Sequence, residues 1–157
     1  MRQSAARLAA VQALYQIELT GVSIETVISE FRTYRRGGVL EEALARANLT
    51  KFEALIRGVE THRGDLDAKI TAALAEDWAL ERLGSVLLSI LRSAAFELLT
   101  SRDVPAKVII NEYVDLAHAF FEKSEAGFVN GILDRLAREL RKLEMEQITR
   151  ERPSSSG

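Results

Sequence analysis

The segment SVLLSILRSAAFELL, residues 85–99, constrains the fold of this chain most strongly, because it is apolar around most of a helical circumference. Its polar side chains form one narrow stripe, which consists of Ser85, Ser89, Arg92, Ser93 and Glu97. A helix with so few polar side chains must be surrounded by other elements. We therefore predict that residues 85–99 form a central helix inside the folded domain.

The remaining sequence supplies helices that can surround this segment. Ala and Leu are abundant, alternating β-branched runs are missing, and only two prolines occur. This pattern predicts an all-α fold with about seven helices. Helical periodicity places them at about residues 3–20, 23–34, 41–62, 105–120 and 125–147, with a further helix after Gly64 and a short one within 77–84.

Local signals predict helix ends and inward-facing side chains. Ser23 is the expected N-cap of the second helix, and Asp77 is the expected cap of the short one. Pro105 suits the first turn of the helix that follows it. The helical spacing predicts that Phe120 and Leu143 point inward in the last two helices.

Composition describes an ordinary domain. The chain has 157 residues, of which 47% are apolar and 28% charged, and this suits one domain at residues 1–148. Residues 149–157, TRERPSSSG, are predicted to form a disordered tail. The lack of cysteine excludes a disulfide scaffold and a thiolate zinc site, and it fits a cytoplasmic protein. The N-terminus resembles neither a signal peptide nor a membrane span, because polar residues interrupt it.

The net charge of −2 means that any binding to nucleic acid must come from a local basic patch. One candidate is the pair Arg2 and Arg7 at the N-terminus. A second cluster, Arg32, Arg35 and Arg36, lies beside a Gly-Gly pair, although a solubilising loop explains this cluster better. The role of the Arg35–Arg36 loop stays open.

The sequence contains one weak candidate for a catalytic or metal site. Asn111, Asp115, His118 and Glu122 fall at successive helical steps, which could mimic a metal or acid–base cluster. A solvated polar face is the better explanation, because one helix face supplies too few convergent ligands. A Gly-rich phosphate loop, an H-E-x-x-H motif and a nucleophile elbow are all missing from the sequence. The sequence therefore predicts no enzyme, no cofactor and no metal site.

The stretch EKSEAGFVNGILDRL, which begins at Glu122, places Phe128 at the mouth of the last predicted helix. Spacing alone favours a hydrophobic staple into the core. The alternative is that the ring stacks on an unpaired RNA base while amides at the helix start attract a phosphate. Gly131 is predicted to allow close helix packing, and Trp78 is predicted to fill the core rather than to form a stacking platform.

Read together, five segments resemble the NusB family of bacterial transcription antitermination factors. They occur in the family's order and cover most of the chain outside residues 22–51 and the tail. The segments are RLAAVQALYQIELTG at 7–21, FEALIRGVETHRGDLDAKI at 52–70, WALERLGSVLLSILRSAAFELL at 78–99, VPAKVIINEYVDLAHAF at 104–120 and FVNGILDRLA at 128–137.

The resemblance implies an all-helical fold of two three-helix-like subdomains with an extra helix. It also implies binding to the boxA element of ribosomal-RNA leader transcripts together with NusE, a small-subunit ribosomal protein. This pair would join other Nus factors on RNA polymerase and suppress termination, without a cofactor. With the resemblance, stacking of Phe128 on an RNA base becomes the preferred interpretation over the hydrophobic staple. The expected RNA contacts are Arg2, Arg7, Lys123, Phe128 and Asn130.

The chain departs from the family's pattern in two places. Its N-terminus has fewer arginines, and Gly127 stands where a basic residue often precedes the phenylalanine, so Lys123 is expected to substitute from one turn away. Fewer phosphate contacts predict modest RNA affinity for the isolated chain and more reliance on NusE. Leu87 replaces an acidic residue that many relatives carry on the partner-facing side.

Apolar spacing suggests where NusE could bind. We predict that Tyr15, Leu19 and Leu87 form a small patch that NusE covers, while the alternative places all three in the core. Two alternative interpretations of the chain are an RNA-binding module of an rRNA methyltransferase and a helical adaptor without RNA binding. The sequence leaves open whether the chain is a monomer or a homodimer.

Overall fold

The computed structural model describes residues 2–34, 39–75 and 78–151, and all regular elements in these ranges are helical, as predicted. The elements are α1 (Arg2–Thr20), α2 (Ile24–Tyr34), α3 (Val39–Thr61), α4 (Arg63–Ala73), a 3-10 turn η1 (Leu80–Arg82), α5 (Ser85–Thr100), α6 (Ala106–Ala117), α7 (Lys123–Leu140) and α8 (Lys142–Glu151).

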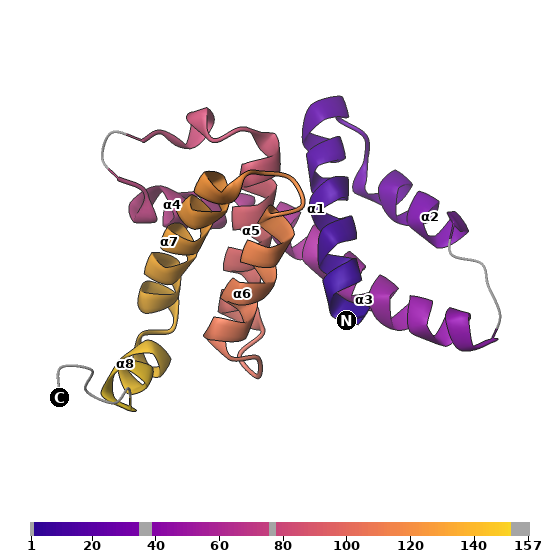
Figure 1. Cartoon of the computed structure of the whole chain (residues 1–157). Helices are drawn as coiled ribbons and strands as arrows, with labels where there is room; N and C mark the ends of the chain where they lie inside the picture. The colour runs from indigo at the N-terminus through magenta and orange to yellow at the C-terminus, as the bar shows by residue number, and fades with distance from the viewer. Residues whose placement is uncertain (1, 35–38, 76–77, 152–157) are drawn as a thin grey trace.

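The helices form two groups on either side of α5 (Figure 1). One group contains α1, α2 and α3, and the other contains α4, α6, α7 and α8. Helix α5 contacts α1 and α3 from the first group and α4, α6 and α7 from the second. The prediction of a central helix is therefore confirmed, and α5 joins the two groups into one fold.

The packing of α1 follows from its small side chains. Ala6, Ala10 and Ala13 recur at helical spacing and are buried against the rest of the core. Because alanine side chains are short, they let neighbouring backbones approach closely. Helix α1 makes its most extensive contacts with α3 and also packs on α5. The N-terminal helix is thus part of the core rather than a projecting arm.

Helix α5 buries its polar stripe together with its apolar faces. Ser89, Arg92, Ser93 and Glu97 are all buried. Arg92 donates two hydrogen bonds to Asp67 on α4, at 2.7 and 3.0 Å. The Ser89 hydroxyl donates to the Ser85 carbonyl one turn earlier, at 2.8 Å. Charged groups in such a position need partners, because an unpaired buried charge is costly.

The helix ends follow several of the local signals. The Ser23 hydroxyl accepts a hydrogen bond from the Thr26 amide at 3.1 Å, as expected for an N-cap. Pro105 is the residue before α6 rather than a member of its first turn. Of the short helix predicted within residues 77–84, only the 3-10 turn η1 is present in the described residues. Asp77, its predicted cap, lies outside the described residues.

Arg141 divides the predicted last helix into α7 and α8. Its buried guanidinium donates to the carbonyls of Glu97, Leu98 and Ser101, at 3.3, 2.8 and 2.7 Å, and also to Val104. The last carbonyls of a helix lack partners within it and carry partial negative charge. Arg141 therefore caps α5, and its own backbone leaves the helical conformation at φ −129° and ψ 50°.

Three predictions near the C-terminal ends of helices are wrong. Leu143 is 83% exposed rather than inward-facing, because the helix is interrupted at Arg141 and Leu143 belongs to the separate helix α8. Phe120 is 37% exposed, because α6 has already ended at Ala117. The tail was expected from residue 149, yet α8 continues to Glu151. Residues 152–157 lie outside the described ranges.

Candidate nucleic-acid and partner surfaces

The start of α7 differs from the expected helix mouth. The helix begins at Lys123, and the Glu125 carboxylate accepts a hydrogen bond from the Glu122 amide at 2.8 Å. Phe128 therefore lies in the second turn, so its predicted place at the mouth is wrong. The carboxylates of Glu122 and Glu125 form a capping box at this end. They also oppose the approach of a phosphate, so the expected anion site at the helix start is not available.

Phe128 lies between the core and the surface. It is partly buried and packs on the core at one edge. Its ring centroid lies 5.5 Å from that of Trp78, with the planes tilted by 48°. Trp78 itself is 43% exposed, so the prediction that it fills the core is wrong. The Arg82 guanidinium carbon is 5.8 Å from the centroid of the Trp78 ring.

An exposed strip runs along α7 beside Phe128, and we call it the α7 strip. It consists of Lys123, Gly127, Asn130 and Gly131, which recur at three- and four-residue steps and are all exposed. A Cβ atom added at Gly127 or Gly131 would meet no other atom within 4 Å. The expected packing role of Gly131 is therefore wrong. The backbone of α7 is open to the surface at both glycines.

Arg7 does not lie on the surface. Its side chain is only 3% exposed, and its Nε and Nη2 atoms donate to Glu97 at 2.7 and 2.9 Å. Its Nη1 atom lies 3.3 Å from Glu112. The expectation that Arg7 is a free surface cation is wrong, because two carboxylates neutralise it inside the fold. The side chain of Arg2 is outside the described part of the chain.

The buried Glu97 carboxylate on α5 bonds side chains from three other helices. Lys51 on α3 lies 2.6 Å from its carboxylate, and the Tyr113 hydroxyl on α6 donates to it. Burial raises the pKa of a carboxyl group, yet hydrogen bonds from Arg7, Lys51 and Tyr113 hold the pKa of Glu97 below its usual value. Burial and the adjacent Glu97 carboxylate raise the pKa of Tyr113 well above its usual value. This network connects α1, α3, α5 and α6.

One signal in the amino-acid sequence points to this network. A charged residue in a helix that is apolar on most faces requires a buried partner of opposite charge. Glu97 in α5 is such a residue, and Arg7 stands between two pairs of apolar residues, Ala5–Ala6 and Leu8–Ala9, in α1. Spacing within one helix does not reveal the pair, because the two residues are 90 positions apart.

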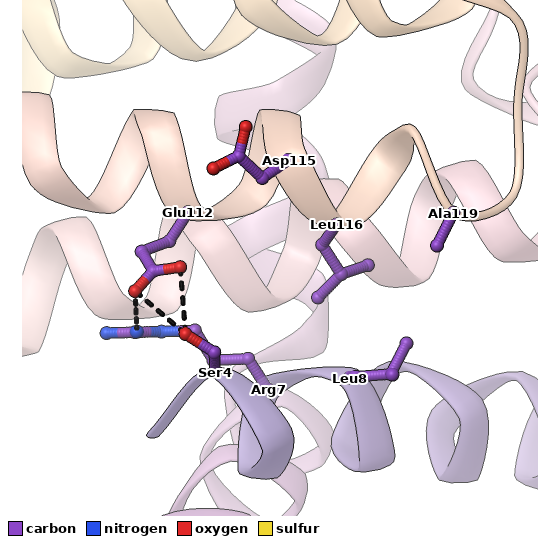
Figure 2. Close-up of a pocket in the computed structure, with 7 residues that line it drawn as sticks. All are labelled: Ser4, Arg7, Leu8, Glu112, Asp115, Leu116 and Ala119. Carbon is purple, nitrogen blue, oxygen red and sulfur yellow. Dashed lines mark hydrogen bonds and ion pairs between the residues drawn. The ribbon is translucent and has the colours of Figure 1, made fainter. Parts of the chain in front are cut away.

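A hollow of about 330 Å³ lies beside this network, between α1 and α6. Figure 2 shows Ser4 and Arg7 from α1 facing Glu112 from α6, and the Ser4 hydroxyl lies 3.0 Å from both carboxylate oxygens. Asp115 adds a second carboxylate to the lining. Since Arg7 is already paired, the two acidic side chains make this hollow a poor place for an RNA phosphate.

The three residues predicted to bind NusE do not form one exposed patch. Leu87 is only 8% exposed and belongs to the core, so its predicted place on the surface is wrong. Burial of Leu87 follows from the position of α5 between the two groups of helices. Tyr15 is half-buried, and Leu19 is 65% exposed near the end of α1. Leu19 and Tyr15 thus remain as the accessible pair.

Among the residues that it describes, the structure gives no support for a metal or catalytic site at the other residues singled out from the sequence. Asn111, Asp115, His118 and Glu122 are all exposed, as expected for a solvated polar face. Within the described ranges, no group of three His, Asp or Glu side chains is arranged to hold a metal ion. Arg32 pairs with Glu53, whereas Arg35 and Arg36 lie outside those ranges. No helix in the described part of the chain is long and apolar enough to cross a membrane.

The NusB family model matches residues 4–138, which span α1 to α7 almost completely. The chain belongs to the NusB family. Its relatives include the transcription antitermination protein NusB of Caulobacter vibrioides, with 49% identity over 88% of this chain and 94% of that protein. The NusB of Novosphingobium aromaticivorans is 45% identical over 88% of this chain and 95% of its own length.

A solved structure supports the same assignment. The T. maritima NusB structure covers 92% of this chain and 96% of its own, with a TM-score of 0.71 and 33% sequence identity. The all-α arrangement around α5 is therefore the NusB fold. The α7 strip and the Trp78–Phe128 pair lie on a fold whose relatives are named for transcription antitermination.

Proposed function

We propose that this chain is a transcription antitermination factor that binds boxA RNA of ribosomal-RNA leader transcripts together with NusE. The observation that carries the proposal is the match to proteins named for antitermination. The match covers 88% of this chain and 94% or 95% of each relative. In the proposed role the chain joins other Nus factors at RNA polymerase and helps the polymerase read through terminators. The role includes no catalytic step.

The proposed RNA surface is the α7 strip with the adjoining ring of Phe128. Unpaired bases stack on aromatic side chains, and the partly exposed Phe128 offers such a face. Lys123 supplies a positive charge one turn before Gly127, and Asn130 supplies an amide that can donate to and accept from a base edge. Phe128 and Asn130 flank the bare backbone at Gly127 from opposite sides, since they lie about 100° and about −60° from it around the helix, at about 100° per residue.

Charge explains why a protein partner belongs in the proposal. The net charge is −2, and the best-placed arginine, Arg7, is neutralised by Glu97 and Glu112. Lys123 is exposed, and no carboxylate in the described part of the chain pairs with it. Together with Arg2 and the exposed Arg82, Lys123 provides only a few cations for phosphates, so the RNA affinity of the isolated chain should be modest and weakly salt-dependent. NusE would supply the missing contacts.

We place the NusE contact at the end of α1. Leu19 is a large apolar side chain that remains 65% exposed, and the half-buried Tyr15 lies one turn before it. A partly buried aromatic residue with an exposed aliphatic neighbour resembles the centre of many protein interfaces. The burial of Leu87 removes it from this contact.

The decisive experiment measures fluorescence anisotropy of a labelled boxA RNA with the chain alone and with NusE. We expect tighter binding with NusE, and weaker binding of an RNA with the same bases in scrambled order. Phe128→Ala should weaken boxA binding about 5- to 150-fold, which corresponds to the loss of one stacked base. Phe120→Ala is the matched control, because Phe120 is a partly exposed aromatic residue outside the α7 strip.

Two outcomes would contradict the proposal. Equal affinity for boxA and scrambled RNA, with and without NusE, would leave a helical adaptor as the better reading. A Phe128→Ala variant that melts several degrees lower but binds boxA normally would make Phe128 a core residue only. Read-through of a terminator in a reconstituted transcription reaction tests the role itself, and it should fall when the chain is omitted.

A further inference from the structure

Trp78 and Arg82 form an aromatic and cationic cluster with Phe128 at the edge of α7. The Trp78 and Phe128 rings are 5.5 Å apart, and Arg82 lies 5.8 Å from the Trp78 ring. Trp78 remains 43% exposed and Arg82 is also exposed. No carboxylate in the described part of the chain forms an ion pair with Arg82. The indole therefore has apolar surface that the fold itself leaves uncovered.

The cluster is held in place by its backbone. The Trp78 amide donates to the Ala75 carbonyl at 2.9 Å, and the Arg82 amide donates to the Ala79 carbonyl at 3.0 Å. Leu83, next to Arg82, is buried and anchors this segment in the core. Because the segment is already ordered, the indole would lose little conformational freedom on binding a ligand.

We propose that Trp78 stacks on an unpaired RNA base next to the base that contacts Phe128, and that Arg82 positions the indole. Two rings tilted by 48° suit adjacent bases of a single strand, whose bases are not held parallel by a duplex. Every base offers a face for stacking on an indole. The inference rests on the proposed RNA-binding function and extends its site from α7 to Trp78 and Arg82.

Stacking rather than charge must carry this contact. The acidic Glu81 is exposed and directly precedes Arg82. Its carboxylate opposes a phosphate, whereas stacking does not depend on its charge. The contribution of Trp78 to RNA affinity should therefore be the same at low and at moderate salt, unlike that of a phosphate contact.

Trp78 is the only tryptophan in the chain, so its fluorescence reports on this site directly. The full chain is titrated with an unlabelled boxA RNA, while anisotropy of a labelled copy measures binding in parallel. We expect the emission of Trp78 to be quenched with the same midpoint as the anisotropy change. Trp78→Leu should weaken binding about 5- to 150-fold, and Trp78→Phe should recover most of the loss.

Arg82 is tested through the indole that it positions. Arg82→Gln should shift the Trp78 emission of the free protein and weaken RNA binding by a smaller factor than Trp78→Leu does. Arg82→Lys keeps the cation beside the ring and should restore both readouts. Melting curves of every variant identify any loss of folding.

Other results would overturn the inference in distinguishable ways. If RNA binds but a folded Trp78→Leu variant binds it within twofold of the parent, the indole is not a stacking site, while the proposed function stands. If Trp78 emission responds to NusE and not to RNA, the cluster is a protein contact instead. If boxA RNA binds neither the chain nor its complex with NusE, this inference and the proposed function both fail.

Discussion

Replacing Arg7 by alanine tests whether this residue serves the fold or the RNA. Arg7 and Glu97 are 3% and 0% exposed, and two hydrogen bonds of 2.7 and 2.9 Å join them. The variant leaves the Glu97 carboxylate buried with only Lys51 and Tyr113 as partners. Removing one partner of a buried ion pair typically costs about 3–5 kcal/mol.

That cost is a large part of the stability of an ordinary domain, which is about 5–15 kcal/mol. For a chain of this size, 1 kcal/mol lowers the melting temperature by about 2–4 °C, so Arg7→Ala should melt roughly 6–20 °C lower. Thermal unfolding followed by circular dichroism at pH 7 measures this directly. Arg57→Ala is the matched control, because it breaks the exposed pair with Glu25 and should leave the melting temperature nearly unchanged.

The same variant separates the structural role from a contact with RNA. At a temperature where Arg7→Ala is folded, the slope of log K against log salt should equal that of the parent chain. A phosphate contact would instead reduce the slope by about 0.7. The reasoning is refuted if Arg7→Ala melts within a degree of the parent, or if its salt slope falls by that amount while its fold is intact.

Three further predictions follow from the same contacts. The pKa of Glu97 is lowered in the folded chain. The stabilisation from its ionised carboxylate is therefore present above the unfolded pKa of about 4.3 and is lost as pH falls through the lower folded pKa. In urea unfolding, the free energy of unfolding of Glu97→Gln should depend less on pH in this acidic range than that of the parent chain. Gly131→Ala should stabilise the fold by about 0.5–1 kcal/mol, because the added Cβ meets no atom; destabilisation in a urea titration would reveal a contact that the structure lacks. Leu19→Asp should abolish capture of NusE without changing the melting temperature, whereas Leu87→Asp should lower the free energy of unfolding by several kcal/mol; a stable Leu87→Asp protein would contradict the burial of Leu87.

The sequence by itself determined the fold class, the central helix and the family. Helical periodicity depends on residues a few positions apart, so the apolar circumference of residues 85–99 was readable without coordinates. The N-cap at Ser23 is local in the same sense, because its hydroxyl bonds an amide three residues later. The solvated face around His118 also followed from spacing within one helix.

Only the tertiary structure decided which polar residues lie inside. Arg7 and Arg2 look alike in the sequence, yet Arg7 is neutralised by a carboxylate 90 positions away. The uniform helical pattern of residues 125–147 gave no sign of the break at Arg141, because the cause is the set of carbonyls at the far end of α5.

The candidate RNA site depends on the same kind of long-range placement. Phe128 was identifiable from its own segment, but its neighbour Trp78 comes from a loop 50 positions earlier and lies beside it only after α4 and α7 pack. Spacing within one helix specifies which face is apolar. It does not specify which distant side chain meets that face, because helix packing sets those contacts, and this is why the ring pair and the buried charges required the folded chain.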